Sequence, residues 1–445
     1  MKAVNDQTNF VRGFRSSAPY IHAYRGRVFV LQFDGDALLE PQFSTLVHDM
    51  ALLHSLGVKL VIVHGIRPQI EERLALRGLE TRFVEGVRVT GADALTAVIE
   101  AAGSVRTEVE ALLSMGLANS PMHGAGVRVA SGNFVTARPV GIRDGVDFAF
   151  TGEVRRVDTQ AIGRHLDDGN IVLVSPLGYS PSGEVFNMRA EDVATEIALE
   201  LKARKLLLLR TGPWLASAAG ALPRQLSLSD ARQALGHKPS TDSAGGDFAR
   251  KFLTHAVRAC VNGVARTHLL DYHVDGVLLL ELFTRDGIGT MVSAEAYDTT
   301  RRATVEDIGG ILELIQPLEE QGALVRRSRD KLETAIHDFL VLERDGAIIA
   351  CAALHPFPED GVAELACVAV DDAYRNSGRG DLLLGEVERE SRAGGIERLF
   401  VLTTRATHWF KERGFEDARI EDLPVERQEL YNYERGSKVL IKKLS

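Results

Sequence analysis

Cysteine and long apolar runs are scarce in this chain, and each shortage excludes a class of protein. The 445 residues include three cysteines, Cys260, Cys351 and Cys367, without a CxxC pair or a zinc-ligand spacing. Neither a disulfide framework nor a metal site is therefore expected. No apolar run approaches the roughly 18 residues of a membrane-spanning helix, and the first residues lack the apolar core of a signal peptide. We therefore expect a cytoplasmic protein without a membrane partner.

An excess of positive charge is also lacking. The chain has 52 basic and 61 acidic residues, a formal net charge of −9. Bulk charge therefore gives no support to a nucleic-acid partner. With 45% hydrophobic and 25% charged residues, the composition is that of a globular protein. The length suits about two or three domains.

Short apolar runs alternate with helical stretches over the first two thirds of the chain. This alternation is typical of βαβ units, whose parallel strands are buried on both faces. We therefore expect an αβα sandwich with a mostly parallel sheet over residues 25–292. A stretch rich in small residues, 211–247, predicts a surface excursion. The apolar runs cover residues 27–33, 59–63, 171–174 and 206–209.

A separate helix is expected at 1–24, before the first apolar run. Phe10, Val11 and Phe14 have helical spacing, and Pro19 is the predicted end of the helix.

The pattern restarts after a predicted linker at 293–300. Thr304 begins a capping box, and Arg344-Asp345-Gly346 lies between two strand-like runs, a strong hairpin signal. We expect a second α/β domain with a mixed sheet over residues 301–445.

The strongest local signal is a basic, glycine-containing turn between a strand and a helix. It reads Arg375-Asn-Ser-Gly378-Arg379-Gly380 and follows the strand that ends near Val370. Glycines allow close backbone approach, and the amides of a helix N-terminus favour an anion. Two arginines add charge-assisted donors, so a pyrophosphate suits this turn.

The turn resembles motif A of the GNAT acetyltransferases, which grips the pyrophosphate of coenzyme A. The resemblance implies that acetyl-CoA is the cosubstrate. It implies cofactor contacts from the strand and from the turn, at Cys367, Val368, Val370, Arg375, Ser377, Gly378, Arg379 and Gly380.

Acetyl transfer to an amine needs a base, a donor for the carbonyl oxygen and a proton for the departing thiolate. Glu364, on the strand before the turn, is the expected base and acts through water. Cys367 is either a nucleophile or a small buried strand residue, with nearby amides holding the thioester oxygen. Many GNAT enzymes have a tyrosine donor where this chain has Phe410, so Thr403 or Thr404 is considered, with Thr403 as the candidate.

The first 292 residues resemble the amino-acid kinase fold, N-acetylglutamate kinase in particular. Residues 63–70 look like its phosphate turn, and 86–90 and 186–192 look like its acyl-glutamate-binding segments. Residues 281–290, ELFTRDGIGT, closely match its C-terminal segment.

Three departures from the kinase pattern argue against phosphoryl transfer. Gln32 replaces a lysine that would offset the charge of the transferring group. Ile66 and Arg67 replace glycines of the phosphate turn, and their side chains are expected to obstruct it. The acidic nucleotide-binding turn is missing after 206–209. We therefore expect that this domain is not a kinase.

The arginine-sensing features of regulated kinases are present, which implies L-arginine as an effector. A guanidinium prefers a bidentate carboxylate together with carbonyl oxygens. Glu281 and the backbone near Gly287 are the candidates, and Tyr20 of the N-terminal helix is expected to cover the ligand's stem. The resemblance implies that L-arginine inhibits the activity, although the sequence itself does not show whether L-arginine inhibits or activates.

A silenced kinase domain followed by a GNAT domain resembles the bacterial N-acetylglutamate synthase family over nearly the whole chain. The resemblance implies acetyl transfer to the α-amino group of L-glutamate, the first step of arginine synthesis. It also implies a homo-oligomer, with a hexamer among the options. A dicarboxylate needs two cationic anchors. The expected substrate-binding residues are Leu324, Arg326, Phe410, Arg435 and Ser437.

Two other functions stay open from the sequence. A surviving N-acetylglutamate kinase with an accessory GNAT domain is opposed by Gln32. A ligand-regulated protein-lysine acetyltransferase is opposed by Arg326 and Arg435, because a lysine side chain needs no carboxylate anchors.

Overall fold

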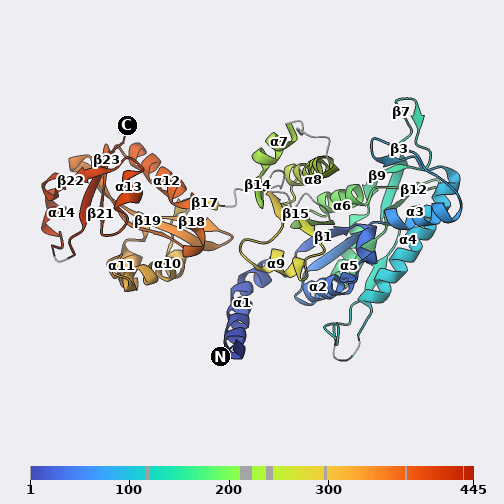
Figure 1. The fold of residues 1–445 in the computed structure, drawn as a ribbon, viewed down its shortest axis with the longest axis horizontal. Helices are drawn as coiled ribbons and strands as arrows, with labels where there is room; N and C mark the ends of the chain where they lie inside the picture. The colour runs from blue at the N-terminus through green and yellow to red at the C-terminus, as the bar shows by residue number, and fades with distance from the viewer. Residues whose placement is uncertain are drawn as a thin grey trace. The chain divides into compact units, whose positions relative to one another are not determined.

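The chain forms two compact units, Met1–Glu295 and Ala296–Ser445. Each has its own sheet and hydrophobic core and is described by itself (Figure 1). Most of the expected surface excursion at 211–247 lies outside the described residues. The computed structural model describes residues 2–116, 118, 120–210, 223–236, 244–294, 298–375, 378–433 and 435–444.

The first unit is built on a mostly parallel sheet. Its described strands have the order β14-β16-β15-β13-β1-β2-β10-β5, and β15 and β16 are antiparallel. Alternate side chains of β1 enter opposite cores: Phe29 and Leu31 lie in one, Val30 in the other. Both faces are covered, as expected for a parallel sheet. The strands are β1 (Val28–Phe33), β2 (Lys59–His64), β5 (Val129–Ser131), β10 (Ile171–Val174), β13 (Lys205–Arg210), β14 (Gln225–Ser227), β15 (Arg266–Asp271) and β16 (Thr290–Ser293).

Helices cover the two faces of this sheet and complete the αβα sandwich. On one face lie η1 (Gly35–Leu39), α2 (Phe43–Ser55), α3 (Arg67–Leu76), α4 (Ala92–Leu113) and α9 (Val277–Phe283). On the other lie α5 (Thr159–Asp167), α6 (Ala190–Glu200), α7 (Leu228–Gly236) and α8 (Ala244–Val261). A smaller sheet and two hairpins consist of β6 (Val135–Pro139), β9 (Gly152–Val157), β11 (Leu177–Tyr179), β12 (Val185–Asn187), β3 (Phe83–Val84), β4 (Val87–Arg88), β7 (Ile142–Arg143) and β8 (Val146–Asp147).

The N-terminal helix α1 (Lys2–Tyr24) continues through Pro19, where the sequence predicted its end. An interior proline removes one N–H donor and crowds the preceding turn. Packing holds the last turn in place. Tyr24 is buried, with its ring centroid 5.2 Å from that of Phe29 and 6.0 Å from that of Phe283. Tertiary contacts therefore override the local stop signal.

The second unit has a mixed sheet in the order β17-β18-β19-β20-β21-β23-β22 among its described strands. β20 is antiparallel to β19 and parallel to β21. Helices α10 and α11 pack on one face, and α12 and α13 on the other. The strands are β17 (Asp298–Arg302), β18 (Phe339–Arg344), β19 (Ala347–Phe357), β20 (Val362–Val370), β21 (Arg398–Thr403), β22 (Glu416–Ala418) and β23 (Lys438–Lys443). The helices are η3 (Val305–Asp307), α10 (Ile308–Glu320), α11 (Arg329–Thr334), η4 (Ile336–Asp338), η5 (Pro358–Asp360), η6 (Asp372–Tyr374), α12 (Arg379–Ala393), α13 (Thr407–Lys411), η7 (Ile420–Asp422) and α14 (Val425–Glu429).

Two local signals of this unit are confirmed. Asp345 and Gly346 join β18 to β19 with φ values of 52° and 80°, which a type I′ hairpin turn requires. The amide of Thr304 donates to Asp307 at 2.7 Å within a capping box.

Part of the predicted linker is a strand. β17 begins at Asp298 and pairs antiparallel with β18. Its sequence, DTTRR, lacks apolar alternation, so periodicity could not reveal it. Ion pairs of Arg301 with Asp307 and Glu343 help to hold this edge strand.

Among the described residues, no helix combines the length and apolar character that crossing a bilayer requires. Within the same ranges, no group of three His, Cys, Asp or Glu side chains is arranged to hold a metal ion.

Candidate active site

Strands β20 and β21 separate part-way along their length. They pair only over residues 362–364 and 398–400, although β20 continues to Val370 and β21 to Thr403. Beyond Glu364, the facing backbone groups of these two strands therefore do not bond to each other. Unpaired main-chain groups between diverging strands are available to a ligand.

A bulge in β20 follows the point of divergence. Against β19, Cys351 pairs with Ala369 and Ala353 pairs with Ala366, so β20 has one extra residue there. Cys367 lies in this bulge with φ of 51°, a conformation that is uncommon without glycine. Bulges re-aim backbone groups, which suits the expected use of the amides near Cys367.

The thiol of Cys367 is buried beside that of Cys351. The Cys351 thiol donates to the carbonyl oxygen of Cys367 at 3.6 Å. A hydrogen bond with Cys367, together with burial, raises the pKa of Cys351. This packing fits a small buried strand residue better than a nucleophile.

Glu364 forms a bidentate ion pair with Arg427 of α14. Nε of Arg427 donates to one carboxylate oxygen at 2.6 Å, and Nη2 donates to the other at 3.1 Å. The two side chains are 10% and 22% exposed, respectively. The pair fixes the direction of the carboxylate just before the strands diverge. An arginine on both oxygens also competes with water or an amine for them.

The predicted pyrophosphate turn lies between β20 and α12. Gly378 caps α12 with φ of 78°, and no atom lies within 4 Å of the place where its Cβ would be. Arg375 pairs with Asp372 at 2.6 Å, and Arg379 pairs with Asp298 at 3.1 Å. The open backbone, the helix N-terminus and the two arginines suit an anion. Ser377 lies outside the described residues.

Glycine is required at position 380 for a different reason than at position 378. A Cβ at Gly380 would lie 2.8 Å from a ring carbon of Trp409, so the indole requires a glycine there. Val368 and Val370 are half-buried and pack against the core on the α12 side of the sheet. Their predicted cofactor contacts stay predictions.

Thr403 lies at the end of β21, opposite Lys438 of β23. Its hydroxyl oxygen accepts the amides of Ala406 at 3.0 Å and Arg405 at 3.4 Å. With its oxygen occupied as an acceptor, the hydroxyl still has its own proton to donate. This geometry suits a proton donor.

The structure brings several of the expected substrate-binding residues near one another. Nη2 of Arg435 donates to the carbonyl oxygen of Ala323 at 2.6 Å, next to Leu324. Ser437 is buried and precedes the strand residue that pairs with Thr403. Arg326 follows Leu324 by two residues and is exposed. The segments around 324 and 435 therefore meet, and their binding of substrate stays a prediction.

Phe410 is part of the hydrophobic core. It is 4% exposed, with ring centroids 4.9 Å from Trp409 and 5.2 Å from Phe415. The aromatic ring therefore packs the unit, and its expected contact with substrate stays a prediction.

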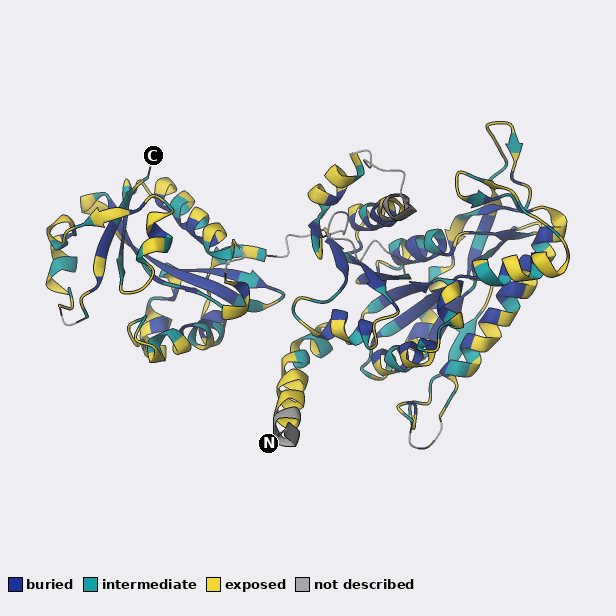
Figure 2. Ribbon diagram, viewed as in Figure 1, coloured by how far each residue is buried: buried dark blue, intermediate teal, exposed yellow. Residues whose placement is uncertain are grey.

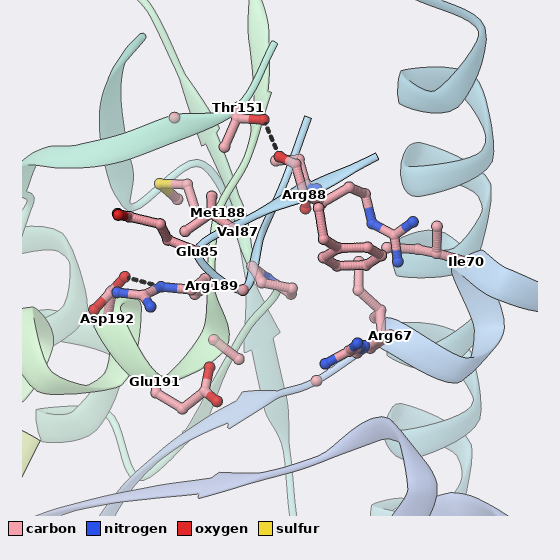
Figure 3. Close-up of a pocket in the computed structure, with 18 of the residues that line it drawn as sticks. Arg67, Ile70, Glu85, Val87, Arg88, Thr151, Met188, Arg189, Glu191 and Asp192 are labelled. Carbon is pink, nitrogen blue, oxygen red and sulfur yellow. Dashed lines mark hydrogen bonds and ion pairs between the residues drawn. The ribbon is translucent and has the colours of Figure 1, made fainter. Parts of the chain in front are cut away.

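The first unit has a cleft at the carboxyl ends of its parallel strands (Figure 3), with a volume of about 860 Å³. At its base, Arg210 pairs with Asp34 at 2.6 Å and with Glu191 at 2.9 Å. Burial raises the pKa of Asp34 to about 6, although Arg210 opposes this shift. Gln32, at the lysine position of the kinases, donates to Asp34 at 3.0 Å. The charge of Arg210 is thus offset within the cleft by two carboxylates.

The altered phosphate turn, Gly65-Ile66-Arg67, forms part of the cleft lining. Arg67 lines the cleft, as Figure 3 shows. Ile66 also lines the cleft, although its side chain is 4% exposed and packs in the hydrophobic core, so its expected obstruction of the turn stays a prediction. A Cβ at Gly65 would lie 2.7 Å from the amide nitrogen of Gly35, which leaves this position to glycine.

Two of the predicted effector residues, Glu281 and Gly287, lie close to the start of β16. Glu281 is 7% exposed, and one of its oxygens accepts the amides of Ile288 at 2.7 Å and Gly289 at 2.8 Å. A Cβ at Gly287 would lie 2.4 Å from the same oxygen. The carboxylate therefore holds this loop in shape, a role that the sequence did not suggest.

Two further titratable groups, His268 and Lys205, extend this cluster inward. Nδ1 of His268 lies 2.6 Å from the other Glu281 oxygen, and its Nε2 lies 3.1 Å from Nζ of the buried Lys205. Burial, and then Lys205, lower the pKa of His268 to about 4. The ammonium of Lys205 lies 5.1 Å from the centroid of Tyr24, and Tyr20 lies one turn earlier in α1. Helix α1 is thus tied to the Glu281 cluster.

Three functional candidates were missed from the sequence: Arg427, Lys205 and His268. Each has its partner far along the chain: Arg427 is 63 residues from Glu364, and Lys205 is 63 from His268. No local spacing signals such pairs.

Two families match the chain. The amino acid kinase family matches residues 27–271, and the acetyltransferase (GNAT) family matches residues 310–415. The fold and site therefore define a GNAT acyltransferase fused to an amino-acid-kinase unit. Amino-acid acetyltransferases from Azotobacter vinelandii and Pseudomonas putida are each 53% identical over 98% of this chain and 100% of their own length. This chain belongs to the amino-acid acetyltransferase family.

Two solved structures are similar to this chain over nearly its whole length. N-acetylglutamate synthase from Neisseria gonorrhoeae, complexed with coenzyme A and L-arginine, is 38% identical, with a TM-score of 0.87 over 98% of this chain and 99% of that one. The synthase from the same organism, complexed with coenzyme A and N-acetyl-glutamate, is 39% identical with a TM-score of 0.61 and the same coverage.

Proposed function

We propose that this chain transfers the acetyl group of acetyl-CoA to the α-amino group of L-glutamate and is regulated by L-arginine. One observation carries the proposal: strand β20 holds Glu364 where it leaves β21, then the bulge at Cys367, and then runs into the basic turn. A base, backbone donors and an anion site thus follow in order along one strand. The similarity to N-acetylglutamate synthase supports the choice of glutamate.

The residues of the turn and β20 fit the cosubstrate. Arg375, Arg379 and the amides after Gly378 would hold its pyrophosphate, with Ser377, Gly380, Val368 and Val370 as the further contacts that we propose. Acetyl-CoA, when bound, supplies an acetyl group activated as a thioester. Amides at the Cys367 bulge would donate to the carbonyl oxygen.

Proton transfer would use two side chains on neighbouring strands, Glu364 on β20 and Thr403 on β21. Glu364 would take a proton from the α-ammonium group of glutamate, directly or through one water. Thr403 would donate the proton that the leaving thiolate needs. Burial of the Cys367 thiol leaves attack by the free amine as the simpler route.

The acceptor's two carboxylates need cationic partners. Arg326 and Arg435 would supply them, with Leu324 and Ser437 shaping the site. Arg427 adds a third guanidinium, already directed at Glu364. Arg427 already binds the carboxylate of Glu364, so its guanidinium is suited to a carboxylate of the substrate as well.

We propose a regulatory role for residues 25–292, with 301–445 as the catalytic domain and 1–24 as a helical extension. L-arginine would bind beside Tyr20 and the Glu281–Gly287 loop. This domain would not phosphorylate, because Arg210 is neutralised by Asp34 and Glu191. Coupling requires that arginine bind two conformations unequally.

A homo-oligomer, with a hexamer among the options, is supported by α1. Much of α1 is exposed (Figure 2). Phe10 and Phe14 are 71% and 62% exposed, and their ring centroids lie 6.1 Å apart in a stacked arrangement. Exposed aromatic pairs on a projecting helix suit a protein interface. We also propose that the protein acts in the cytoplasm.

The test is a coenzyme A release assay with the full chain, acetyl-CoA and each of the common amino acids, with and without L-arginine. We expect turnover with L-glutamate and a response to L-arginine. Turnover with peptide lysine but not with free glutamate would instead favour a protein acetyltransferase. No release with any acceptor would refute the proposal.

A further inference from the structure

His355 lies directly opposite Glu364 in the antiparallel pairing of β19 with β20. Opposite residues of such a pair point to the same face of the sheet, with their Cβ atoms about 5 Å apart. The next pair, Leu354 and Leu365, points to the other face and packs in the core with α12. His355 is therefore the cross-strand neighbour of the expected base.

One ring nitrogen of His355 is held by a second carboxylate. Nδ1 lies 3.1 Å from Oδ2 of Asp338, the last residue of η4. Since a carboxylate only accepts hydrogen bonds, Nδ1 carries a proton and donates it to Asp338. In the neutral ring, Nε2 is then the acceptor. Among the described residues Nε2 has no hydrogen-bond partner, so it is available to take up a proton.

The exposure of the side chains increases along this row of residues. Glu364 is 10% exposed, His355 is 28% exposed and Asp338 is 42% exposed. The row crosses from β20 to β19 and on to η4, which precedes β18. Histidine is suited to carry protons because its ring gains and loses a proton near neutral pH. The three side chains thus lead from a nearly buried carboxylate toward solvent.

The proposed reaction must release one proton in each turnover. The α-ammonium group of the acceptor loses two protons when it becomes an amide N–H, and the leaving thiolate takes up one of them. The other proton must reach solvent before Glu364 can act again. Arg427 donates to both oxygens of Glu364, and such bonds are stronger to the charged carboxylate than to a neutral acid. The pair therefore favours passing the proton on.

We propose that His355 is a relay residue that takes this proton from Glu364 at Nε2, through one water, and releases it to solvent. The O–H bond of protonated Glu364 breaks as an N–H bond forms at Nε2, and that N–H bond then breaks toward solvent. Asp338 stabilises the charged ring in between. His355 acts only through Glu364 and does not touch the substrate. The inference rests on the proposed function for the reaction and for the role of Glu364.

The first variant separates the relay from the structural contact. His355→Asn keeps an N–H donor at the place of Nδ1, so it can still bind Asp338, but it lacks the acceptor nitrogen. Its kcat at saturating substrates should fall about tenfold or more, as expected when a positioned proton acceptor is lost. The KM for glutamate and the coenzyme A affinity, measured by calorimetry, should stay within about twofold of the parent. A parent-like kcat would overturn the relay.

His337→Gln is the matched control. His337 is the exposed neighbour of Asp338 in η4, and its carbonyl oxygen accepts from Arg302 at 2.8 Å. This variant removes a histidine beside the same carboxylate residue, and its kcat should equal that of the parent. Equal losses of kcat in His337→Gln and His355→Asn would assign the effect to the fold of η4 and would contradict the relay.

A second variant replaces the ring by a soluble one. His355→Ala leaves space for free imidazole beside Glu364, and urea unfolding checks that the variant is folded. In dilute buffer its kcat should rise about threefold or more when imidazole is added, whereas the parent should change less than about twofold. Free imidazole can accept a proton but cannot tie η4 to β19. A folded His355→Ala protein without this rescue would rule the relay out.

A third variant tests the carboxylate beside the ring. Asp338→Asn leaves an amide oxygen for Nδ1 but no charge, so kcat should fall about three- to tenfold, less than in His355→Asn. A kcat equal to that of the parent would exclude Asp338 from the relay. If the parent itself releases no coenzyme A with glutamate, the proposed function fails. If the parent turns over and His355→Asn is equally fast, only the relay fails, so the two failures are distinct.

Discussion

Arg427 donates hydrogen bonds to both carboxylate oxygens of Glu364, at 2.6 and 3.1 Å, although the two residues are 63 positions apart in the sequence. The contact joins a short helix near the end of the chain to the strand that carries the expected base. A guanidinium fork fixes the plane of a carboxylate as well as its position. The base of the proposed reaction is therefore held in place by a residue outside the GNAT motif.

Glu364→Gln should lower kcat for glutamate about 100-fold or more, because an amide cannot take the amine's proton. Coenzyme A affinity should change less than twofold. Steady-state kinetics and calorimetry on the same preparation measure both. Glu359→Gln, an exposed carboxylate just before β20, is the control and should behave like the parent. Unchanged turnover in Glu364→Gln would remove this residue as the base.

Arg427→Ala should lower kcat roughly 10- to 100-fold, because it leaves a nearly buried carboxylate without its orienting partner. Arg427→Lys keeps the charge but cannot form the fork, so its kcat should fall between those of the parent and Arg427→Ala. The ranking of the three kcat values is the measurement. If Arg427→Lys equals the parent, the bidentate geometry has no role.

In the second unit, the sequence predicted local features but not a contact between distant segments. The hairpin at Asp345-Gly346 and the cap at Thr304 were predictable, because a few adjacent residues determine each. Strand β20 was predictable for the same reason. The Arg427–Glu364 pair was not, since it depends on how a distant loop returns to the sheet.

The first unit shows the same limit at Pro19 and Glu281. A proline is a local stop signal, but buried Tyr24 contacts keep α1 helical beyond it. The sequence identified the segment that contains Glu281 by resemblance. It could not indicate that Lys205 and His268, from two different strands, lie against that carboxylate. Local chemistry was predictable, whereas long-range charge pairing was not.

Thr403→Val should lower kcat at least tenfold, because it removes the hydroxyl proton while keeping the side-chain volume. Thr403→Ser keeps the hydroxyl and its acceptor role toward Ala406, so it should retain most activity. Both variants are compared at saturating acetyl-CoA and glutamate. Equal kcat values for the valine and serine variants would exclude Thr403 as proton donor.

Gly287→Ala should abolish most of the response to L-arginine while sparing basal turnover. Its Cβ would lie 2.4 Å from a Glu281 oxygen, so the loop must move. Gly276→Ala is the control: φ there is 69°, close to the 58° of Gly287, but no atom lies within 4 Å of its Cβ position. Both variants have a similar backbone strain of about 1–2 kcal/mol, and only one has the clash. A normal arginine response in Gly287→Ala would place the effector elsewhere.

Acid should destabilise the first unit through His64. The side chain is fully buried, its Nε2 lies 2.8 Å from the Ser175 hydroxyl, and burial lowers its pKa from 6.5 to about 4. Because the folded state favours the neutral ring, the unfolded chain binds more protons between pH 6.5 and 4. Stability from this group is therefore complete above pH 6.5 and is lost as the pH falls toward 4.

His64→Gln removes this titration while keeping an amide that can bond to Ser175. Between pH 7 and pH 5, the parent should lose about 2 kcal/mol more unfolding free energy than the variant. Urea unfolding of the full chain at the two pH values gives the comparison. His123→Gln, at an exposed position, should follow the parent. If the parent and His64→Gln lose the same free energy, the buried ring does not set the acid sensitivity.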